Sequence, residues 1–364
     1  MDYMGAYARP AYMQEGIKVV DVKSEFFPGQ LFKFPQPDYP MKPIDNFKLA
    51  TAHKTPCWMP NATIDFQSYY MSEFLEGFVI FPWGIDEEVV YKDEFGCQWK
   101  YIVSAGGAML DPGGKAIVDD VTKWEKLVKF PEIKLNGSDF MEKTHDPDKV
   151  FRVDIFQGLT ERLVGLMGGY TEAMLALAEE PEACADFFEA FTDWEIAQID
   201  KLYEKYPINV IIYHDDWGTE RDTFFSERTM EELVLEPTRR IVQHVKSKGA
   251  AFELHSCGAI GRFMKYILDV GIDILQIQSR ANDIPQMKRD FGDKICFNIY
   301  DNSLASATPT ESEIVTAARK IVDTFGESGG AYTHTFMVNP EYAWVLTNEL
   351  YAYSREYYDY ERKA

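Results

Sequence analysis

Histidine, cysteine and carboxylate side chains stand at the ends of several apolar runs in the second half of this 364-residue chain. Tyr213-His214-Asp215-Asp216-Trp217 follows one apolar run, and His255-Ser256-Cys257-Gly258 follows another. Gln278, Tyr300-Asp301 and His334 follow three later runs. Three of the six histidines therefore share this position, which indicates a site built from the ends of strands.

His255 and Cys257 have the spacing of a metal-binding pair. Residues i and i+2 of a strand point to the same side, so this imidazole and this thiolate can be presented together. The pair suits Zn²⁺, and a catalytic zinc uses three protein ligands and keeps one position open. The pattern predicts zinc at His255 and Cys257. The alternative is that Cys257 is a small buried side chain and that His255 hydrogen-bonds a substrate.

The predicted catalytic residues are His214, Asp215, Asp216 and His255. Two carboxylates in one pocket raise the pKa of one of them, which suits a general acid near neutral pH. We expect function for one aspartate, and for the other a structural role on backbone N–H groups. His214 and Asp215 point to opposite sides of an ideal strand, so both face one pocket only if the strand has ended. The other side chains at these ends are predicted to bind substrate: Tyr213, Trp217, Gln278, Tyr300, Asp301 and His334.

Alternating strand and helix patterns must position these residues. Apolar strands separated by amphipathic helices predict parallel βαβ units, here an α/β fold of the (β/α)8 TIM-barrel type, with a doubly wound open sheet as the alternative. One or two further strands are expected near 55–60. The predicted strands are 150–156, 208–214, 251–256, 273–278, 294–300 and 331–337. The predicted helices are 159–168, 171–179, 182–204, 230–248, 260–270, 284–291, 310–325 and 340–361.

The first part of the chain differs from the rest in amino-acid composition and in its predicted elements. It is rich in proline, glycine and aromatic residues, with short β-like runs that include 78–82. Residues 88–91 and 97–103 are predicted to form a hairpin, and 106–115 a hairpin or lid loop. We therefore expect residues 1–364 to form a single barrel domain, in which 1–150 contains an N-terminal β-rich elaboration and the hairpin insertion.

Composition excludes several classes of function. The formal charge is 37 − 59 = −22, which argues against nucleic acid or an anionic membrane as partner. The five cysteines are scattered and form no C-x-x-C pair, so a disulfide framework is not expected. The sequence predicts neither a signal peptide nor an apolar run of about 18 residues that could span a bilayer. A cytoplasmic protein is the expectation.

From about residue 93 onward the sequence resembles the uroporphyrinogen decarboxylase superfamily. The resemblance implies a (β/α)8 barrel. It is carried by Asp93-Glu94-Phe95-Gly96 with Trp99, Gly158–Leu163, Leu166–Gly169, Leu177–Glu182, Asp215–Thr219, His255–Gly258, Val270–Leu275 and Gly329–Tyr332.

Within this superfamily the corrinoid-dependent methyltransferases are the more similar branch. The arginine-rich R-Q-A-G-R-Y motif of the decarboxylases is absent, and a polycarboxylate substrate suits a −22 protein poorly. That branch binds zinc with H-x-C and a distant cysteine. His255 and Cys257 match the motif, whereas 332–340 contains no cysteine, so that His334 is a candidate substitute.

The sequence also resembles the anaerobic methyltransferases that demethylate phenyl methyl ethers. This resemblance implies transfer of a methyl group from an ether such as guaiacol or veratrole to Co(I) of a separate corrinoid protein. Acid or Lewis-acid contact at the ether oxygen would activate the leaving group. The alternatives are transfer from a methylcobamide to a thiol or tetrahydrofolate, uroporphyrinogen decarboxylation, and a non-catalytic binding barrel. The partners implied are the corrinoid protein and the methyl donor. The sequence leaves the oligomeric state open, with a homodimer as one alternative.

Overall fold

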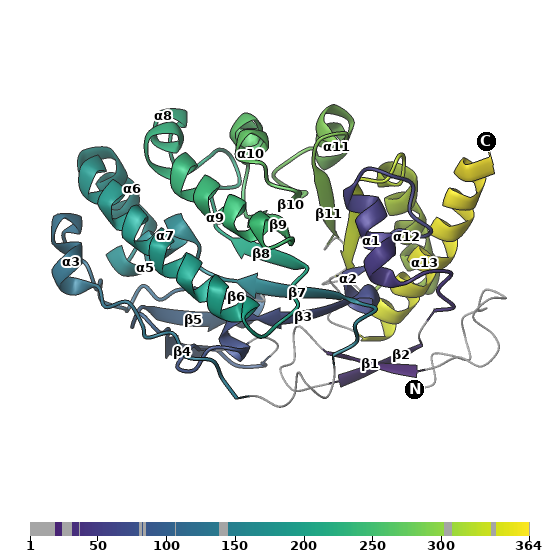
Figure 1. Ribbon diagram of the computed structural model, residues 1–364, viewed down its shortest axis with the longest axis horizontal. Coiled ribbons are helices and arrows are strands. Elements are labelled where there is room, and N and C mark those ends of the chain that lie inside the picture. Colours follow the sequence, from purple (N-terminus) through teal and green to yellow (C-terminus); the bar gives the residue numbers. More distant parts are fainter. Residues whose placement is uncertain are drawn as a thin grey trace.

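The computed structural model describes residues 19–23, 31–35, 37–79, 82, 85–105, 107–137, 145–301, 308–335 and 340–363. Its largest element is a curled sheet of seven parallel strands in the order β12-β11-β10-β9-β8-β7-β3 (Figure 1). The strands are β3 (Phe66–Tyr70), β7 (Val150–Ile155), β8 (Val210–His214), β9 (Ala251–Ser256), β10 (Ile274–Ile277), β11 (Cys296–Asp301) and β12 (Ala331–Thr335). The α/β class and six predicted strands are confirmed.

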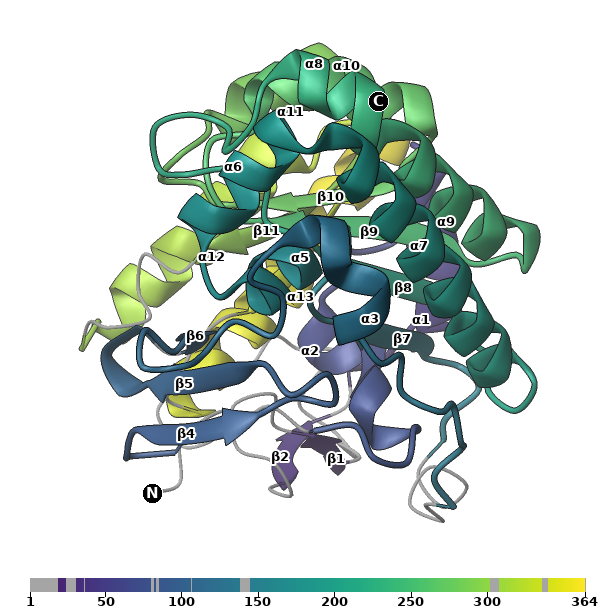
Figure 2. The ribbon, with the colours of Figure 1, turned by 90° about the vertical axis from the view of Figure 1, so that its left-hand side faces the viewer.

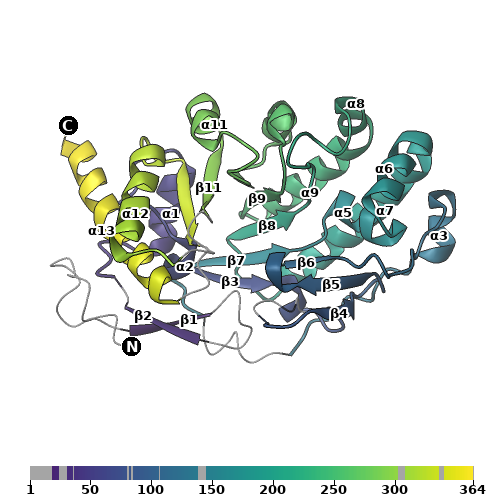
Figure 3. The same cartoon turned by 180° about the vertical axis from the view of Figure 1, so that it is seen from behind.

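Helices connect the strands and cover the outside of the curled sheet (Figures 1 and 3). Their apolar faces pack on the sheet, and each predicted helical pattern contains a helix. Within the described ranges, no helix is long and apolar enough to cross a membrane. The helices that follow β7 are α5 (Leu159–Met167), α6 (Tyr170–Glu179), α7 (Pro181–Tyr203), α8 (Glu227–Thr229), η6 (Met230–Val234), α9 (Leu235–Ser247), η7 (Gly261–Phe263), α10 (Met264–Val270), α11 (Ile284–Phe291), α12 (Glu311–Phe325) and α13 (Pro340–Lys363).

The first part of the chain adds two small antiparallel sheets. One pairs β1 (Val19–Lys23) with β2 (Leu31–Pro35). The other has the order β4-β5-β6 and lies apart from the large sheet (Figure 2). It consists of β4 (Val89–Lys92), β5 (Gln98–Ile102) and β6 (Gly107–Leu110). The predicted hairpin is thus confirmed, and a third strand lies where a hairpin or lid loop was expected. The short helices here are α1 (Pro43–Thr51), α2 (Ala62–Asp65), η3 (Met71–Glu73), η4 (Val103–Ala105), η5 (Val121–Lys123) and α3 (Trp124–Leu127).

The strand predicted near 55–60 is wrong, because this segment is irregular. Pro56 and Pro60 lack the N–H group that a ladder needs, and the first strand of the sheet is β3 instead. Residues 78, 79 and 82 of the β-like run at 78–82 are not in a strand either, and the rest of that run lies outside the described residues. The described part of the chain contains seven strands of the expected eight-stranded barrel, and the assignment of 1–364 to a single domain stays a prediction.

The two edges of the curled sheet approach each other at one bridge. Asn61, just before α2, pairs in parallel with Thr333 of β12. The Thr333 N–H donates to the Pro60 carbonyl at 2.9 Å. Phe66 and Tyr332 stack across the same join with ring centroids 5.2 Å apart. The segment before α2 therefore connects β3 to β12 around the ring.

Side chains on the inner face of the sheet change from apolar to polar along the strands. Alternate residues of a strand share one face, so each strand contributes every second side chain to the interior. Near the amino ends this interior is an apolar cluster of Phe47, Ala62, Phe66, Val150, Val210, Ile274, Cys296 and Tyr332. Toward the carboxyl ends the buried residues include Arg152, Asp154, Glu253, Gln276 and Asn298. The polar end of the sheet is therefore the place for a site.

Candidate active site

The last interior side chains of β8, β9 and β10 are neighbours. His214 pairs with His255 in the register of β8 and β9, and His255 pairs with Gln276 in that of β9 and β10. The two imidazole rings lie 4.6 Å apart between centroids. The fold thus brings two predicted catalytic residues together and adds a glutamine that the sequence analysis did not single out.

Asp216, His255 and Cys257 are three side chains at the ends of β8 and β9 that could together hold a metal ion. Their candidate ligand atoms all lie within 4.8 Å of one another. The His255 Nε2 atom is 3.6 Å from Cys257 Sγ and 4.0 Å from Asp216 Oδ1. The Cys257 N–H also donates to Asp216 Oδ1 at 2.6 Å, which holds the loops after β8 and β9 together. Asp216 is thus placed where it could act as a third donor beside the H-x-C pair.

The hydrogen bond on the other nitrogen fixes the orientation of His255. Its Nδ1 lies 2.6 Å from the side-chain oxygen of Gln276. Because that oxygen only accepts, this contact favours the tautomer of His255 with the proton on Nδ1 and the lone pair on Nε2. This lone pair lies on the nitrogen nearest Cys257 and Asp216. Such an outer contact is typical of a metal-binding histidine.

The donor chemistry and spacing fit a zinc ion. Carboxylate oxygen, imidazole nitrogen and thiolate sulfur are all zinc ligands, and three of them leave one coordination position for water or substrate. Tetrahedral zinc places its nitrogen and sulfur ligands about 3.5 Å apart, close to the 3.6 Å between His255 Nε2 and Cys257 Sγ. Burial, with the Asp216 and Glu161 carboxylates, raises the pKa of the Cys257 thiol. A bound cation would offset this effect and stabilise the thiolate.

Gly258 makes the turn that places Cys257. Its φ is 80°, in the left-handed region that favours glycine. A Cβ at this position would overlap the backbone carbonyl of Gly218. The two loops can therefore touch only because residue 258 is a glycine.

Asp215 and Asp216 occupy different environments. Asp215 is fully buried, and its Oδ1 accepts hydrogen bonds from the Thr160 N–H and hydroxyl and from the Glu161 N–H at the start of α5. Its Oδ2 accepts one from Trp217 Nε1. Burial raises the pKa of Asp215 to about 6. Asp215 therefore secures α5, while Asp216 contributes to the donor group, and the catalytic role of each stays a prediction.

Tyr213 and Trp217 lie in the layer between the sheet and the helices. They are 1% and 2% exposed. The Tyr213 hydroxyl donates to Glu195 Oε2 at 2.8 Å and accepts from the Leu159 N–H. The Trp217 ring lies against Phe263. Both side chains hold helices in place here, and their contact with substrate stays a prediction.

The remaining predicted substrate-binding residues lie just after β10 and on β11 and β12. The side-chain oxygen of Gln278 accepts a 3.2 Å hydrogen bond from the Gly258 N–H, so Gln278 supports the loop of Cys257. Tyr300 and His334 pair in register, and their rings meet edge to face with centroids 6.0 Å apart. Asp301 ends β11, and its side chain lies outside the described part. Their roles stay predictions.

Buried charges next to His214 are functional candidates that the sequence analysis missed. Asp154 Oδ1 lies 3.2 Å from His214 Nε2, and Arg152 Nε donates to Asp154 Oδ2 at 3.1 Å. Burial lowers the pKa of His214 to about 4, so this imidazole is neutral at pH 7. The signal was in the sequence, because Arg152 and Asp154 are charges at positions i and i+2 of an apolar strand and must share its inner face.

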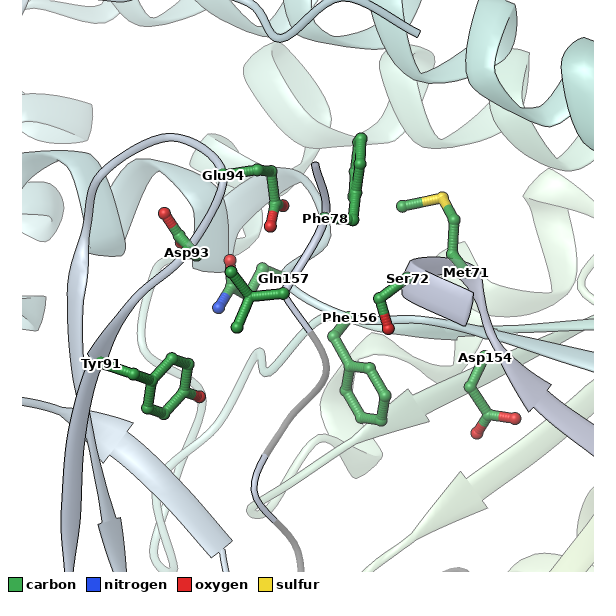
Figure 4. A pocket seen from close by; sticks show the side chains of 10 residues that line it. Met71, Ser72, Phe78, Tyr91, Asp93, Glu94, Asp154, Phe156 and Gln157 are labelled. Carbon is green, nitrogen blue, oxygen red and sulfur yellow. The ribbon is translucent and has the colours of Figure 1, made fainter. Parts of the chain in front are cut away.

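A pocket opens beside Asp154, between the end of β7 and the β4-β5-β6 sheet (Figure 4). It contains about 370 Å³ of space, including the part open to solvent. The lining residues combine aromatic and apolar side chains with a few polar ones: Met71, Ser72, Phe78, Val79, Tyr91, Asp93, Glu94, Asp154, Phe156 and Gln157. A lining of aromatic and apolar side chains with a few polar groups is typical of small-molecule sites.

A parallel α/β sheet with polar side chains at its strand ends occurs in a broad class of proteins. Comparison with known proteins identifies the family within this class. Residues 160–341 match the uroporphyrinogen decarboxylase (URO-D) family, and the chain belongs to this family. A solved methyltransferase from Methanosarcina mazei is similar at 12% identity and a TM-score of 0.46, over 61% of this chain and 73% of that one. No curated protein matches the chain.

Proposed function

We propose that this protein is a methyltransferase that demethylates an aryl methyl ether and passes the methyl group to Co(I) of a separate corrinoid protein. The observation that carries the proposal is the Asp216–His255–Cys257 donor group at the strand ends. An aromatic-lined pocket at the end of β7 supports a flat organic methyl donor. The resemblance of the sequence to the corrinoid-dependent branch of the superfamily points the same way.

Some residues of the proposed site would hold the metal ion, and others orient the side chains around it. Asp216, His255 and Cys257 would hold zinc, which when bound would act as a Lewis acid on the ether oxygen. Gln276 fixes the tautomer of His255. Asp154 holds the neutral His214 ring beside His255. Asp215 anchors the start of α5.

The methyl transfer produces a phenolate as the leaving group. As the methyl group passes to Co(I), its bond to the ether oxygen breaks, and the electron pair of that bond stays on the oxygen as a phenolate. A phenol has a pKa of about 10, so the phenolate takes a proton from water at neutral pH. The transfer therefore depends on stabilising the oxygen that leaves.

The test is an anaerobic assay with purified protein, zinc, cob(I)alamin and guaiacol or veratrole. Loss of the cob(I)alamin absorbance with formation of the phenol supports the proposal. The His255→Ala and Cys257→Ser variants should lose both zinc and activity. Cys57→Ser is the matched control, because Cys57 is also a half-buried free cysteine. The proposal fails if no methyl ether consumes cob(I)alamin, and transfer from methylcobalamin to a thiol would establish the alternative reaction.

A further inference from the structure

The side chain of Gln276 has a second hydrogen-bonding group that its contact with His255 leaves unused. Its oxygen lies 2.6 Å from His255 Nδ1, whereas its amide nitrogen has no hydrogen-bond partner among the described residues. Gln276 is 4% exposed and belongs to the polar interior of the curled sheet. Buried N–H groups in folded proteins are nearly always bonded to another protein group or to ordered water, because an unpaired one is unfavourable. An acceptor is therefore expected beside this nitrogen.

Asn298 of β11 carries an acceptor in the same situation. This residue is 1% exposed, and its amide nitrogen donates to Glu253 Oε1 at 2.7 Å. The Tyr332 hydroxyl donates to the other carboxyl oxygen of Glu253, so both oxygens of that group act as acceptors. The contact with Glu253 thus sets the orientation of the Asn298 amide, and it leaves Oδ1 without a partner in the described ranges of the chain.

The pairing of β10 with β11 brings the two amides next to each other. Leu275 pairs with Phe297, and Gln276 and Asn298 are the following residues of the same two strands. Both side chains lie on the inner face, because they bond alternate residues of β9. Paired strands are about 4.8 Å apart, yet the Gln276 nitrogen and Asn298 Oδ1 form no direct hydrogen bond. A single water molecule can accept from this nitrogen and donate to this oxygen.

From this geometry we infer that one buried water molecule joins Gln276 to Asn298, and that Asn298 is a positioning residue for His255. Every hydrogen bond of the resulting chain runs in one direction. His255 Nδ1 donates to Gln276, and Gln276 donates to the water. The water donates to Asn298, whose nitrogen donates to Glu253. Hydrogen bonds aligned in this way polarise and strengthen one another.

Asn298 favours one tautomer of His255 through this chain. If the Gln276 amide turned over, its nitrogen would face His255 Nδ1, which would have to accept, and the proton of the ring would move to Nε2. The amide oxygen would then face the water, and the common direction of the bonds would be lost. Asn298 therefore favours the tautomer whose Nε2 lone pair lies nearest Cys257 and Asp216. The benefit of this tautomer for zinc rests on the proposed function, whereas the tautomer itself does not.

Nitrogen NMR of the zinc-free protein with isotope-labelled histidine tests the inference. The resonances of His255 are identified by their absence from His255→Ala, and a pH of about 8.5, about two units above the usual pKa of histidine, avoids the protonated ring. In the wild type we expect the Nδ1–H tautomer to predominate. Leucine has a similar shape to asparagine but no polar atom, so Asn298→Leu should lower the ratio of the Nδ1–H to the Nε2–H tautomer about five- to tenfold, the effect of one hydrogen bond. An unchanged ratio overturns the inference.

Two further measurements keep the test decisive. Asn348→Leu is the matched control, because Asn348 is a second buried asparagine whose amide atoms have no partner in the described structure, and it lies on α13. This control should keep the wild-type ratio, and an equal change in both variants would refute the role of Asn298. A crystal structure of the wild type requires no variant. Electron density for a water molecule between Gln276 and Asn298 would support the inference, and the lack of such density would overturn it.

Zinc binding separates the inference from the proposed function. Asn298→Leu should weaken zinc binding about tenfold in a chelator competition, because His255 is then less well oriented. A tautomer ratio that depends on Asn298, in a protein that binds no zinc, would support the inference and refute the proposed donor group. Zinc binding and methyl transfer, with a tautomer ratio that Asn298→Leu leaves unchanged, would support the proposed function and refute the inference.

Discussion

Glu195 should make the stability of this protein fall as pH rises. This residue of α7 is 1% exposed, and the Tyr213 hydroxyl donates to its Oε2 at 2.8 Å. Burial is the largest effect on its carboxyl group, and the pKa of Glu195 is raised to about 8. In the unfolded chain a glutamate has a pKa of about 4.3. The folded protein therefore keeps a proton that the unfolded chain loses between these two values.

The sign and size of the effect follow from this difference. Because the folded state binds more protons, the contribution of Glu195 is fully present below about pH 4 and is lost as pH rises toward 8. The loss is about 1.4 kcal/mol per pH unit, or about 3 to 4 kcal/mol between pH 5 and pH 8. Glutamine does not ionise, so Glu195→Gln should gain stability over the wild type by this amount across the same interval.

Urea unfolding of both proteins at several pH values from about 5 to about 8, followed by tryptophan fluorescence, measures this gain. Asp186→Asn is the control, because Asp186 lies exposed on the same helix and its replacement removes a carboxylate from the surface only. If Glu195→Gln and the wild type differ by the same free energy at every pH, the reasoning about the buried carboxyl group is refuted.

Three other substitutions test the site and its support. Gln276→Leu should weaken zinc binding by about 10- to 100-fold in a chelator competition, since His255 loses its orienting contact; unchanged affinity would contradict this. Gly258→Ala should lower the melting temperature and abolish zinc binding, because its Cβ overlaps the Gly218 carbonyl, and a wild-type melting curve would count against it. Arg162→Met should cost about 3 to 5 kcal/mol in urea unfolding by leaving Asp93 and Glu94 buried without their cation, whereas a cost under 1 kcal/mol would disprove the pairing.

Six of the seven strands of the large sheet were predicted from the sequence, whereas its first strand was not. The run 208–214 is nearly continuous in apolar residues, which is typical of a parallel strand that is buried on both faces. The strand β3 (Phe66–Tyr70) was missed because its sequence, Phe-Gln-Ser-Tyr-Tyr, is mostly polar and aromatic. Its place is set by pairing with β7, which no local pattern reveals.

The sequence pattern indicated two residues of the candidate donor group but not their surroundings. His255 and Cys257 could be paired from their spacing alone, whereas the approach of Asp216 depends on the loop after β8 folding back over Cys257. The residue types of Tyr213 and Trp217 suggested contact with a ligand, but strand alternation turns Tyr213 toward the helices. Gln157 carried no signal in the sequence, because only the fold shows that its buried amide has no partner among the described residues.

The hydrogen bonding between neighbouring segments differs around the curled sheet. Between β12 and the segment before α2 the connection includes the Thr333 N–H, which donates to Pro60, and the Asn61–Thr333 bridge, whereas β9 has a full ladder on either side. Local opening with exchange of amide protons should therefore begin at this seam. His255 and Cys257 lie on and just after β9, the middle strand of the seven. The molecule can thus open locally at this seam while Asp216, His255 and Cys257 keep their arrangement.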